Sequence, residues 1–338
     1  MLGEKLLTKI WETVARDGIA ALAAPWQIRR EGRARLDVRR QEMLTLAQAE
    51  KDADAIRHGR KQLLHDGTIQ ERSEEDSTAL RGDAASDAPE HSNSSILAAA
   101  YAKQEADRIQ SEVNLSRTLL FAEEESGTPD EEVSEEAVDP DWFRRWRESA
   151  EQVQAEELQR LWARTLAGEV KAPGTYSLRT LDFLRNLTKA EAEQITRVAP
   201  YVFGNFLPKF DDAALQSVGI TFATLLDLED MGFVTGHSGI GLQKTLESQQ
   251  TDRYFSFLVN HSKILLLERE SPQPPVTIKG AALTRVGREV ISLGQFSPDL
   301  DYVRKFAEHL KESGVTVKVA DWFPRPDGTG DYRNAVAL

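Results

Sequence analysis

Histidine is the residue type that would most readily form a metal site in this chain, which contains six of them. His58 and His65 lie seven residues apart, so they share one face of a helix at a distance of about two turns. Neither has a second histidine three or four residues away, the spacing at which two imidazoles of one helix bind the same ion. The other four are scattered, with no partner that assigns them a role as base or ligand: His91, His237, His261 and His309. We predict no metal and no cofactor.

The glycine-rich stretch GHSGIG, residues 236–241, is the second pattern that could bind a ligand. Glycines let backbone N–H groups approach an anion, as they do in phosphate loops. This stretch lacks the lysine and the Ser or Thr that complete such a loop, and we interpret it as the tip of a hairpin or wing. Serine-hydrolase and zinc-protease motifs are also absent from the sequence. A non-enzymatic protein is favoured, and the enzyme question stays open because catalytic groups can converge from distant positions.

Arginine gathers in one stretch near the N-terminus, directly after a tryptophan. Such a cluster could contact a polyanion or an anionic membrane surface. Acidic residues alternate with the arginines, so an ordinary charged helix face is the third interpretation. The candidate contact residues are Trp26, Arg29, Arg30, Arg33, Arg35, Arg39 and Arg40.

The net charge of −13 is concentrated in the middle of the chain, with +3 in residues 1–70, −14 in 71–140 and −2 in 141–338. The absence of cysteine excludes disulfides, thiolate zinc sites and cysteine nucleophiles. Acidic residues interrupt the N-terminal apolar positions, and no apolar run approaches the ~20 residues that cross a bilayer. We expect a cytoplasmic protein, with peripheral contact at the inner membrane as an alternative.

The first half of the chain is expected to be helical and charged. Residues 1–70 combine a short amphipathic helix over 2–24 with a long exposed helix over 27–64. The long helix is either a self-associating stalk, as in a coiled coil, or a solvated helix lying on its own protein. Residues 71–138 are expected to form an acidic linker that contains one helix, over 95–123.

The second half opens with the strongest pattern in the sequence. Asp139 can cap a helix whose first residue is Pro140, and a stripe of tryptophans follows. A Pro-Gly-Thr-Tyr-Ser corner then ends one helix and starts another, which Ser177 is expected to cap, before a capping box of Thr188 and Glu191. We interpret this corner as a helix junction rather than a site. The structural motif comprises Trp142, Trp146, Trp162, Pro173, Gly174 and Ser177.

The order of elements after the corner is typical of a winged-helix domain, with three helices followed by β-rich runs. We expect residues 139–296 to form this helical domain with its winged-helix-like β segment, and residues 297–338 to add a helix and a strand. The predicted class is α+β and mostly helical. The helix expected to read DNA, residues 221–231, has three acidic residues and no Lys or Arg, which opposes phosphate binding. A winged helix that binds protein is therefore favoured over a DNA reader.

Residues 141–195 contain the segments LWARTLAGE and PGTYSLRTL, and they resemble a bacterial family of uncharacterised proteins that share this motif. More distantly, the same region is similar to the abortive-infection alpha proteins. The later ALTRVGREV is similar to a segment at the end of winged-helix-like domains in such proteins, and GIAALAAPWQIRREGRARL resembles the N-terminal segment of the uncharacterised family. The resemblance covers roughly residues 18–45 and 140–294. It implies a role in defence against phage and brings no catalytic residues.

Together these patterns favour a non-enzymatic protein that acts by interaction and self-assembly in bacterial anti-phage defence. The expected partners are a second copy of the chain or another protein, with an anionic membrane surface as an alternative. One alternative function is a DNA-associated regulator with a winged-helix domain. Another is an effector enzyme such as a nuclease.

Overall fold

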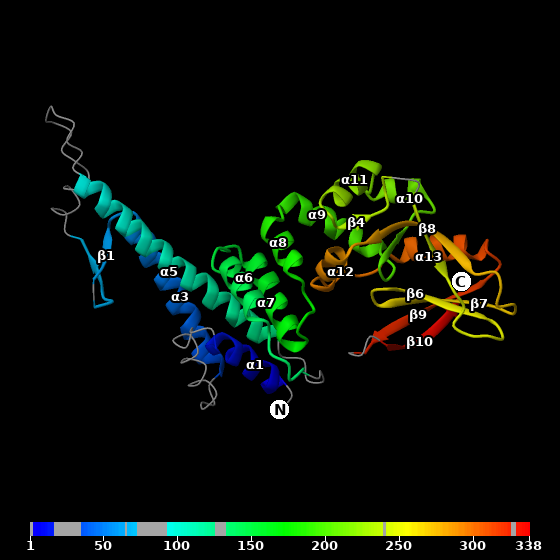
Figure 1. Ribbon diagram of the computed structural model, residues 1–338, viewed down its shortest axis with the longest axis horizontal. Helices are drawn as coiled ribbons and strands as arrows, with labels where there is room; N and C mark the ends of the chain where they lie inside the picture. Colours follow the sequence, from blue (N-terminus) through cyan, green and yellow to red (C-terminus); the bar gives the residue numbers. More distant parts are fainter. Residues whose placement is uncertain are drawn as a thin grey trace. The chain divides into compact units, whose positions relative to one another are not determined.

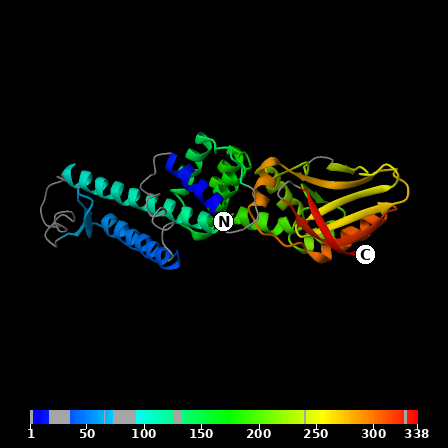
Figure 2. The same cartoon turned by 90° about the horizontal axis from the view of Figure 1, so that it is seen from below.

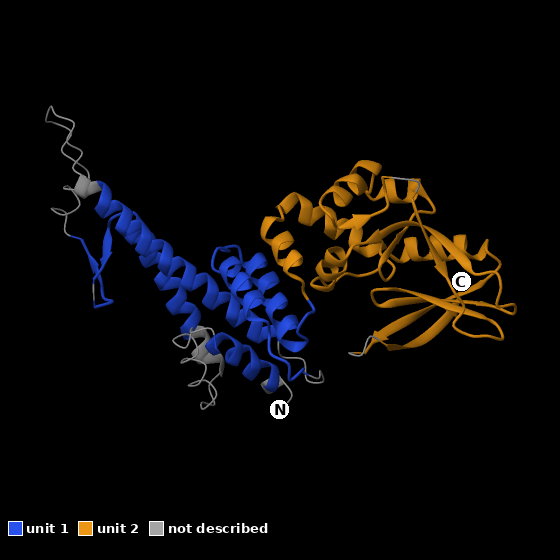
Figure 3. Cartoon of the chain, viewed as in Figure 1, with its two compact units in different colours: residues 1–175 blue, residues 176–338 orange. Residues whose placement is uncertain are grey.

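The structure, a computed structural model of the chain, describes residues 3–16, 35–64, 66–72, 93–125, 133–238, 241–325 and 329–338. The protein is α+β and mostly helical, which confirms the predicted class. It divides into unit 1, residues 1–175, and unit 2, residues 176–338 (Figure 3). This division falls inside the Pro-Gly-Thr-Tyr-Ser corner and therefore within residues 139–296, for which the sequence suggested one domain. None of the helices in the described residues has the length and apolarity needed to cross a membrane.

Unit 1 is built from helices and one small hairpin. Its elements are α1 (Gly3–Arg16), α3 (Arg35–Arg57), β1 (Lys61–Leu63), β2 (Ile69–Glu71), α5 (Asn93–Glu125), α6 (Pro140–Ala150) and α7 (Glu156–Lys171). α1, α6, α7 and the C-terminal half of α5 pack together, and α3 runs along α5 (Figure 1).

Three tryptophans form the centre of unit 1. Trp142, Trp146 and Trp162 are all at most 4% exposed. The indole N–H of Trp146 donates to the Trp162 carbonyl at 2.9 Å, which satisfies the polar atom of a fully buried side chain. The predicted cap is confirmed, since the Asp139 side chain accepts from the Trp142 N–H at 2.9 Å and Pro140 is the first helical residue.

The amphipathic pattern at the N-terminus is explained by packing within unit 1. α1 covers Gly3–Arg16, and the rest of the predicted helix, residues 17–24, lies outside the described residues. Ile10 and Val14 are fully buried, and the Trp11 indole N–H donates to Glu123 Oε1 of α5 at 2.7 Å. The apolar face of α1 is therefore part of the core of unit 1.

The long charged helix ends earlier than predicted, at Arg57, and β1 (Lys61–Leu63) then pairs antiparallel with β2 (Ile69–Glu71). Gly59 is the cause, because it adopts φ +72°, a left-handed conformation that ends helices. The N–H of Arg60 then donates to the Ala55 carbonyl at 2.8 Å and closes the last turn. The prediction of a helix as far as residue 64 was wrong, because it gave more weight to the good helix formers around Gly59 than to the glycine itself.

α5 is a core helix of unit 1, although its neighbours in sequence are acidic. It spans 33 residues, somewhat more than the predicted 95–123. Leu115, Leu119 and Phe121 are at most 4% exposed, and this half of α5 packs on α7. The segment predicted as a linker thus supplies a central helix, while residues 73–92 and 126–132 lie outside the described residues.

Unit 2 joins short helices to two antiparallel sheets. Its helices are α8 (Leu178–Asn186), α9 (Lys189–Val198), the 3-10 turn η1 (Ala199–Tyr201), α10 (Asp212–Ser217), α11 (Phe222–Asp230), α12 (Arg285–Ser292) and α13 (Leu300–Lys311). Its strands are β3 (Phe206–Pro208), β4 (Val234–Thr235), β5 (Leu242–Leu246), β6 (Tyr254–Asn260), β7 (Lys263–Arg269), β8 (Val276–Leu283), β9 (Thr316–Pro324) and β10 (Gly330–Ala337).

The two sheets of unit 2 have different partners. One has the order β3-β8-β4, with β5 also paired to β8, and the other has the order β10-β9-β7-β6. In the second sheet Leu265 lies opposite both Leu258 and Val319, and α13 packs on β9 through a face that includes the buried Phe306 and Leu310. The predicted capping box of α9 is confirmed by the reciprocal contacts of Thr188 and Glu191.

Candidate functional site

The basic cluster predicted from the sequence is largely outside the part of the chain that the structure describes. Trp26, Arg29, Arg30 and Arg33 lie in residues 17–34. Arg35, Arg39 and Arg40 belong to the first turns of α3, where the backbone is described and the side chains are not. Contact of this cluster with a polyanion or membrane therefore stays a prediction.

The Pro-Gly-Thr-Tyr-Ser corner is shaped by local contacts on both sides of Thr175. Gly174 adopts φ +87°, which L side chains rarely adopt, and its N–H donates to Glu169 Oε1 at 2.6 Å. Tyr176 is buried and Ser177 occupies the N-cap position of α8. The corner therefore acts as the predicted helix junction.

Ser177 differs from the prediction in what its side chain binds. No α8 backbone N–H donates to its hydroxyl. Instead both the Ser177 N–H and its hydroxyl donate to Glu289 Oε2 of α12, at 2.7 and 3.0 Å. A carboxylate is the stronger acceptor, so the serine hydroxyl serves as a donor to it rather than as a cap.

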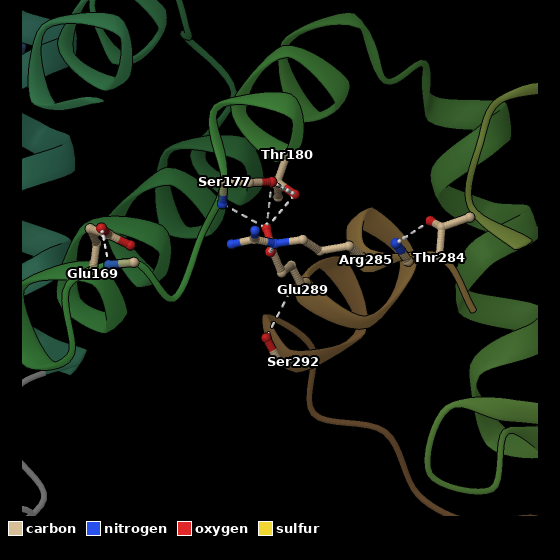
Figure 4. A network of polar contacts seen from close by, with 9 residues as sticks. Glu169, Ser177, Thr180, Thr284, Arg285, Glu289 and Ser292 are labelled. Carbon is tan, nitrogen blue, oxygen red and sulfur yellow. Dashed lines mark hydrogen bonds and ion pairs between the residues drawn. The ribbon is translucent and has the colours of Figure 1, made fainter. Parts of the chain in front are cut away.

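Glu289 is the centre of a polar cluster that joins α8 to α12 (Figure 4). Besides the two contacts from Ser177, its Oε2 accepts from the fully buried hydroxyl of Thr180 at 2.6 Å. Its Oε1 accepts from Arg285 Nε at 2.6 Å. We call Ser177, Thr180, Arg285 and Glu289 the α8–α12 clamp.

The protonation state of Glu289 follows from these contacts. Burial alone would raise the pKa of Glu289, but the hydrogen bonds from Thr180, Ser177 and Arg285 outweigh it and hold that pKa below its ordinary value. The carboxylate is therefore ionised at neutral pH and acts as a fixed acceptor. Its donors hold helices in place, and no histidine lies in the clamp to activate Ser177 as a nucleophile.

α12 is positioned by a close approach to the segment between α11 and β4. Thr284 caps α12 by accepting from the Gly287 N–H at 3.0 Å and donates to the Gly232 carbonyl at 2.6 Å. A Cβ on Gly287 would lie 2.1 Å from the Phe233 carbonyl oxygen. The pattern T-x-x-G-x-E therefore places three residues on one helix: the capping Thr284, the closely packed Gly287 and the clamp carboxylate Glu289.

A groove of about 880 Å³ lies beside the clamp in unit 2. Its walls come from α8, the end of α11 and the start of α12. We call it the unit 2 groove. Its apolar lining residues are Leu178, Phe183, Leu187, Met231 and Val286, and its charged lining residues are Arg179, Asp182, Glu191 and Arg285.

A second groove, of about 390 Å³, follows the pair of helices α3 and α5 in unit 1. The pair is antiparallel, because Arg57 binds Asp107 at 3.2 Å and Glu50 binds Arg117 at 2.7 Å. We call α3, the β1–β2 hairpin and the part of α5 that lies along them the arm (Figures 1 and 2). The hollow is called the arm groove. Its apolar lining residues are Leu46, Ala49, Leu63, Ile109 and Val113, and its charged lining residues are Glu105, Arg108 and Glu112.

The glycine-rich stretch does not offer a phosphate cradle. Glu229 of α11 accepts from the N–H groups of Gly236, His237 and Ser238 at 2.5, 3.0 and 2.7 Å. The amides that could have bound an anion are thus occupied by a side chain of the same chain. The interpretation as a hairpin or wing tip was wrong, because the flanking strands β4 and β5 both pair with β8 and run in the same direction along it. Residues 239–240 of the stretch lie outside the described residues.

Among the described histidines, none belongs to a group that could hold a metal ion. Within the described residues no group of three His, Cys, Asp or Glu side chains could hold a metal ion. His58 Nδ1 lies 2.7 Å from the Asp54 carbonyl of its own helix, and His65 and His91 fall outside the described residues.

Comparison with known proteins gives one match. The family model described as "Protein of unknown function (DUF2806)" matches residues 99–206 of the 338, from α5 to the start of β3. The match includes the tryptophan stripe, the corner and α8, and it ends before α12. No curated protein and no solved structure matches the chain.

Proposed function

We propose that this protein is a non-enzymatic interaction protein that self-associates through its arm. The observation that carries this proposal is the arm groove, an apolar hollow on a layer only two helices thick. Two-helix layers bury too little apolar surface for stability in water, and the usual solution is packing against a further layer. A second copy of the chain supplies two more helices of the same kind, which would complete a four-helix arrangement.

Exposed apolar residues continue the groove along α5. Leu97 and Tyr101 are 56% and 67% exposed, and they precede Glu105 by eight and four residues. Residues at this spacing lie on one face of a helix, so both belong to the side of α5 that lines the groove. Solvated single apolar residues are common on surfaces, but a stripe that continues an apolar groove is typical of an interface.

The charges of the arm groove suit a second copy better than an unrelated partner. Glu105, Arg108 and Glu112 line it, and none of the three has an ion-pair partner within the described ranges. In a two-fold dimer each surface faces its own image, so Arg108 of one copy can approach Glu105 or Glu112 of the other. The surface is self-complementary in both its apolar and its charged residues.

Disulfide trapping tests this proposal, and no native disulfide can interfere because the chain contains no cysteine. A Tyr101→Cys variant is expected to form an intermolecular disulfide in most molecules under mild oxidation, since a two-fold axis brings the two copies of α5 together. The yield is measured on a non-reducing gel. The matched control is Leu44→Cys, because Leu44 is similarly exposed at 63% but lies on the opposite side of α3 from Leu46. Equal yields of disulfide-linked dimer for the two variants would contradict the proposal.

For unit 2 we propose a winged-helix-like domain that binds protein. Its support is the strand order β3-β8-β4, in which β3 precedes α10 and α11 along the chain while β4 and β8 follow them. The helix in the DNA-reading position is α11, whose exposed side includes Asp227 and Asp230. The β6–β7 hairpin, which occupies the place of a wing, is paired with β9 in the other sheet. The acidic charge of α11 opposes phosphate binding, and the hairpin at the wing position is already paired within a sheet. Both observations disfavour a DNA-associated regulator.

We propose a cytoplasmic setting in which the protein contributes to bacterial defence against phage. Its support is the resemblance of residues 141–195 to the abortive-infection alpha proteins. Bacteria expressing the chain are expected to form fewer plaques than bacteria with an empty vector, and the Leu97→Glu/Tyr101→Glu variant should lose this protection. Equal plaque numbers across a broad phage panel would count against this setting. Peripheral membrane contact remains an alternative that depends on residues 26–40, since α1 buries its apolar face within unit 1.

A further inference from the structure

We propose that the unit 2 groove binds a peptide segment of a protein partner, in which an acidic residue lies about one helical turn from apolar side chains. This inference rests on the proposed function in one respect, namely that the protein acts by binding other proteins. It adds a second site and the chemical class of its ligand.

The shape and apolar lining of the groove suit a peptide. Its volume of about 880 Å³ is near the upper end of small-molecule sites, and it is open to solvent. Phe183, Leu187 and Met231 are only partly buried, so their free surface can be covered by a few side chains of a ligand. An open apolar groove between helices is a common docking place for short amphipathic segments.

The charges at the groove select for an acidic ligand. Arg179 is exposed, and no carboxylate pairs with it in the part of the chain that the structure describes. Arg285 is held by Glu289 through Nε, so its guanidinium is fixed beside the groove before a ligand arrives. The N-terminal end of the α12 dipole adds positive potential at the same end.

The acidic residues at the groove limit how much negative charge the ligand can carry. Glu191 is committed to α9, because its Oε2 accepts from both the N–H and the hydroxyl of Thr188. Asp182 and, next to Met231, Asp230 are exposed carboxylates that would repel a polyanion. One carboxylate flanked by apolar side chains matches this distribution, and a nucleic-acid backbone does not.

The walls of the groove are held in place by the α8–α12 clamp. Ser177 and Thr180 fix the start of α8 to Glu289, and Thr284 ties the start of α12 to the end of α11. The three walls therefore keep their spacing without a ligand, which lowers the ordering cost of binding.

The test selects from a random peptide display library on the full-length protein. We expect the enriched peptides to share Asp or Glu three or four residues from Leu, Ile, Phe or Met. In fluorescence anisotropy the best peptide should bind about tenfold more weakly to the Arg179→Glu variant, the size expected for one charge contact in a partly exposed site. The matched control is Arg185→Glu, an exposed arginine on the same helix that does not line the groove, and it should bind as the wild type does. Met231→Gln should weaken binding without altering any charge.

Several results would overturn this inference. They are a library that yields no binder, enriched peptides without acidic residues, and equal effects of Arg179→Glu and Arg185→Glu. Binding of a labelled single-stranded DNA with the same dependence on Arg179 would identify the site as a nucleic-acid site instead. Arm variants change the oligomeric state and groove variants change peptide binding, so failure of one proposal is distinguishable from failure of the other.

Discussion

Replacement of Glu289 by alanine is expected to destabilise unit 2 by about 3 kcal/mol, because it removes a buried carboxylate that accepts four hydrogen bonds. The hydroxyl of Thr180 is fully buried and would lose its charged acceptor. Ser177→Ala removes only one of the four donors and is expected to cost about 1 kcal/mol. The two variants are therefore expected to lower the stability of unit 2 by different amounts through the same cluster.

Hydrogen exchange read by mass spectrometry is the suitable measurement, since five of the six tryptophans lie in unit 1 and fluorescence would report mainly on that unit. In Glu289→Ala the amides of α8 and α12 should exchange faster, while peptides from α6 and α7 serve as an internal control. Unchanged protection of α8 and α12 would show that the clamp does not stabilise unit 2.

The same carboxylate gives unit 2 a dependence on pH. Its pKa is lower in the folded chain than in the unfolded chain, so its contribution to stability is complete above the unfolded value of about 4.3. That contribution is lost as the pH falls from there through the folded pKa. Glu289→Gln keeps the side-chain size without titrating, and it should lack this part of the acid sensitivity.

The largest expected effect on assembly comes from Leu97→Glu combined with Tyr101→Glu. In a two-fold dimer the pair removes four apolar side chains from the interface, each contributing about 1 kcal/mol in a partly buried position. The sum of about 4 kcal/mol corresponds to roughly a thousandfold weaker dimer. Both side chains are more than half exposed in the single chain, so the variant should fold normally, as circular dichroism can verify. Its dissociation constant, measured by sedimentation equilibrium, gives the size of the effect directly.

Features set by neighbouring residues could be predicted from the sequence. Asp139 with Pro140, and Thr188 with Glu191, act within one turn of the helix that they start. The tryptophan stripe marks a buried face because its spacing follows the helical period. Gly59 also indicated the end of α3, since glycine is common just after a helix. The helix-forming residues on either side of it favoured a longer helix.

The clamp and the two grooves could not be predicted in this way, because they depend on residues far apart in the chain. Ser177 and Glu289 are separated by 112 positions. Ser177 fits a cap by residue type, and only the arrival of α12 turns it into a donor. The sequence shows Glu289 only as a polar residue beside Val290. Its burial, which requires hydrogen-bond partners for the carboxylate, is visible only in the structure. Leu97 and Tyr101 fit a helix by spacing, but their exposure depends on how far α3 extends along α5.

Sedimentation equilibrium of the protein at micromolar concentration measures self-association through the arm. We expect the wild type and the Leu44→Glu control to sediment at twice the chain mass of 37.8 kDa, and Leu97→Glu/Tyr101→Glu to sediment at the single-chain mass. A wild type that is strictly monomeric, or a double variant that dimerises as the wild type does, would contradict it.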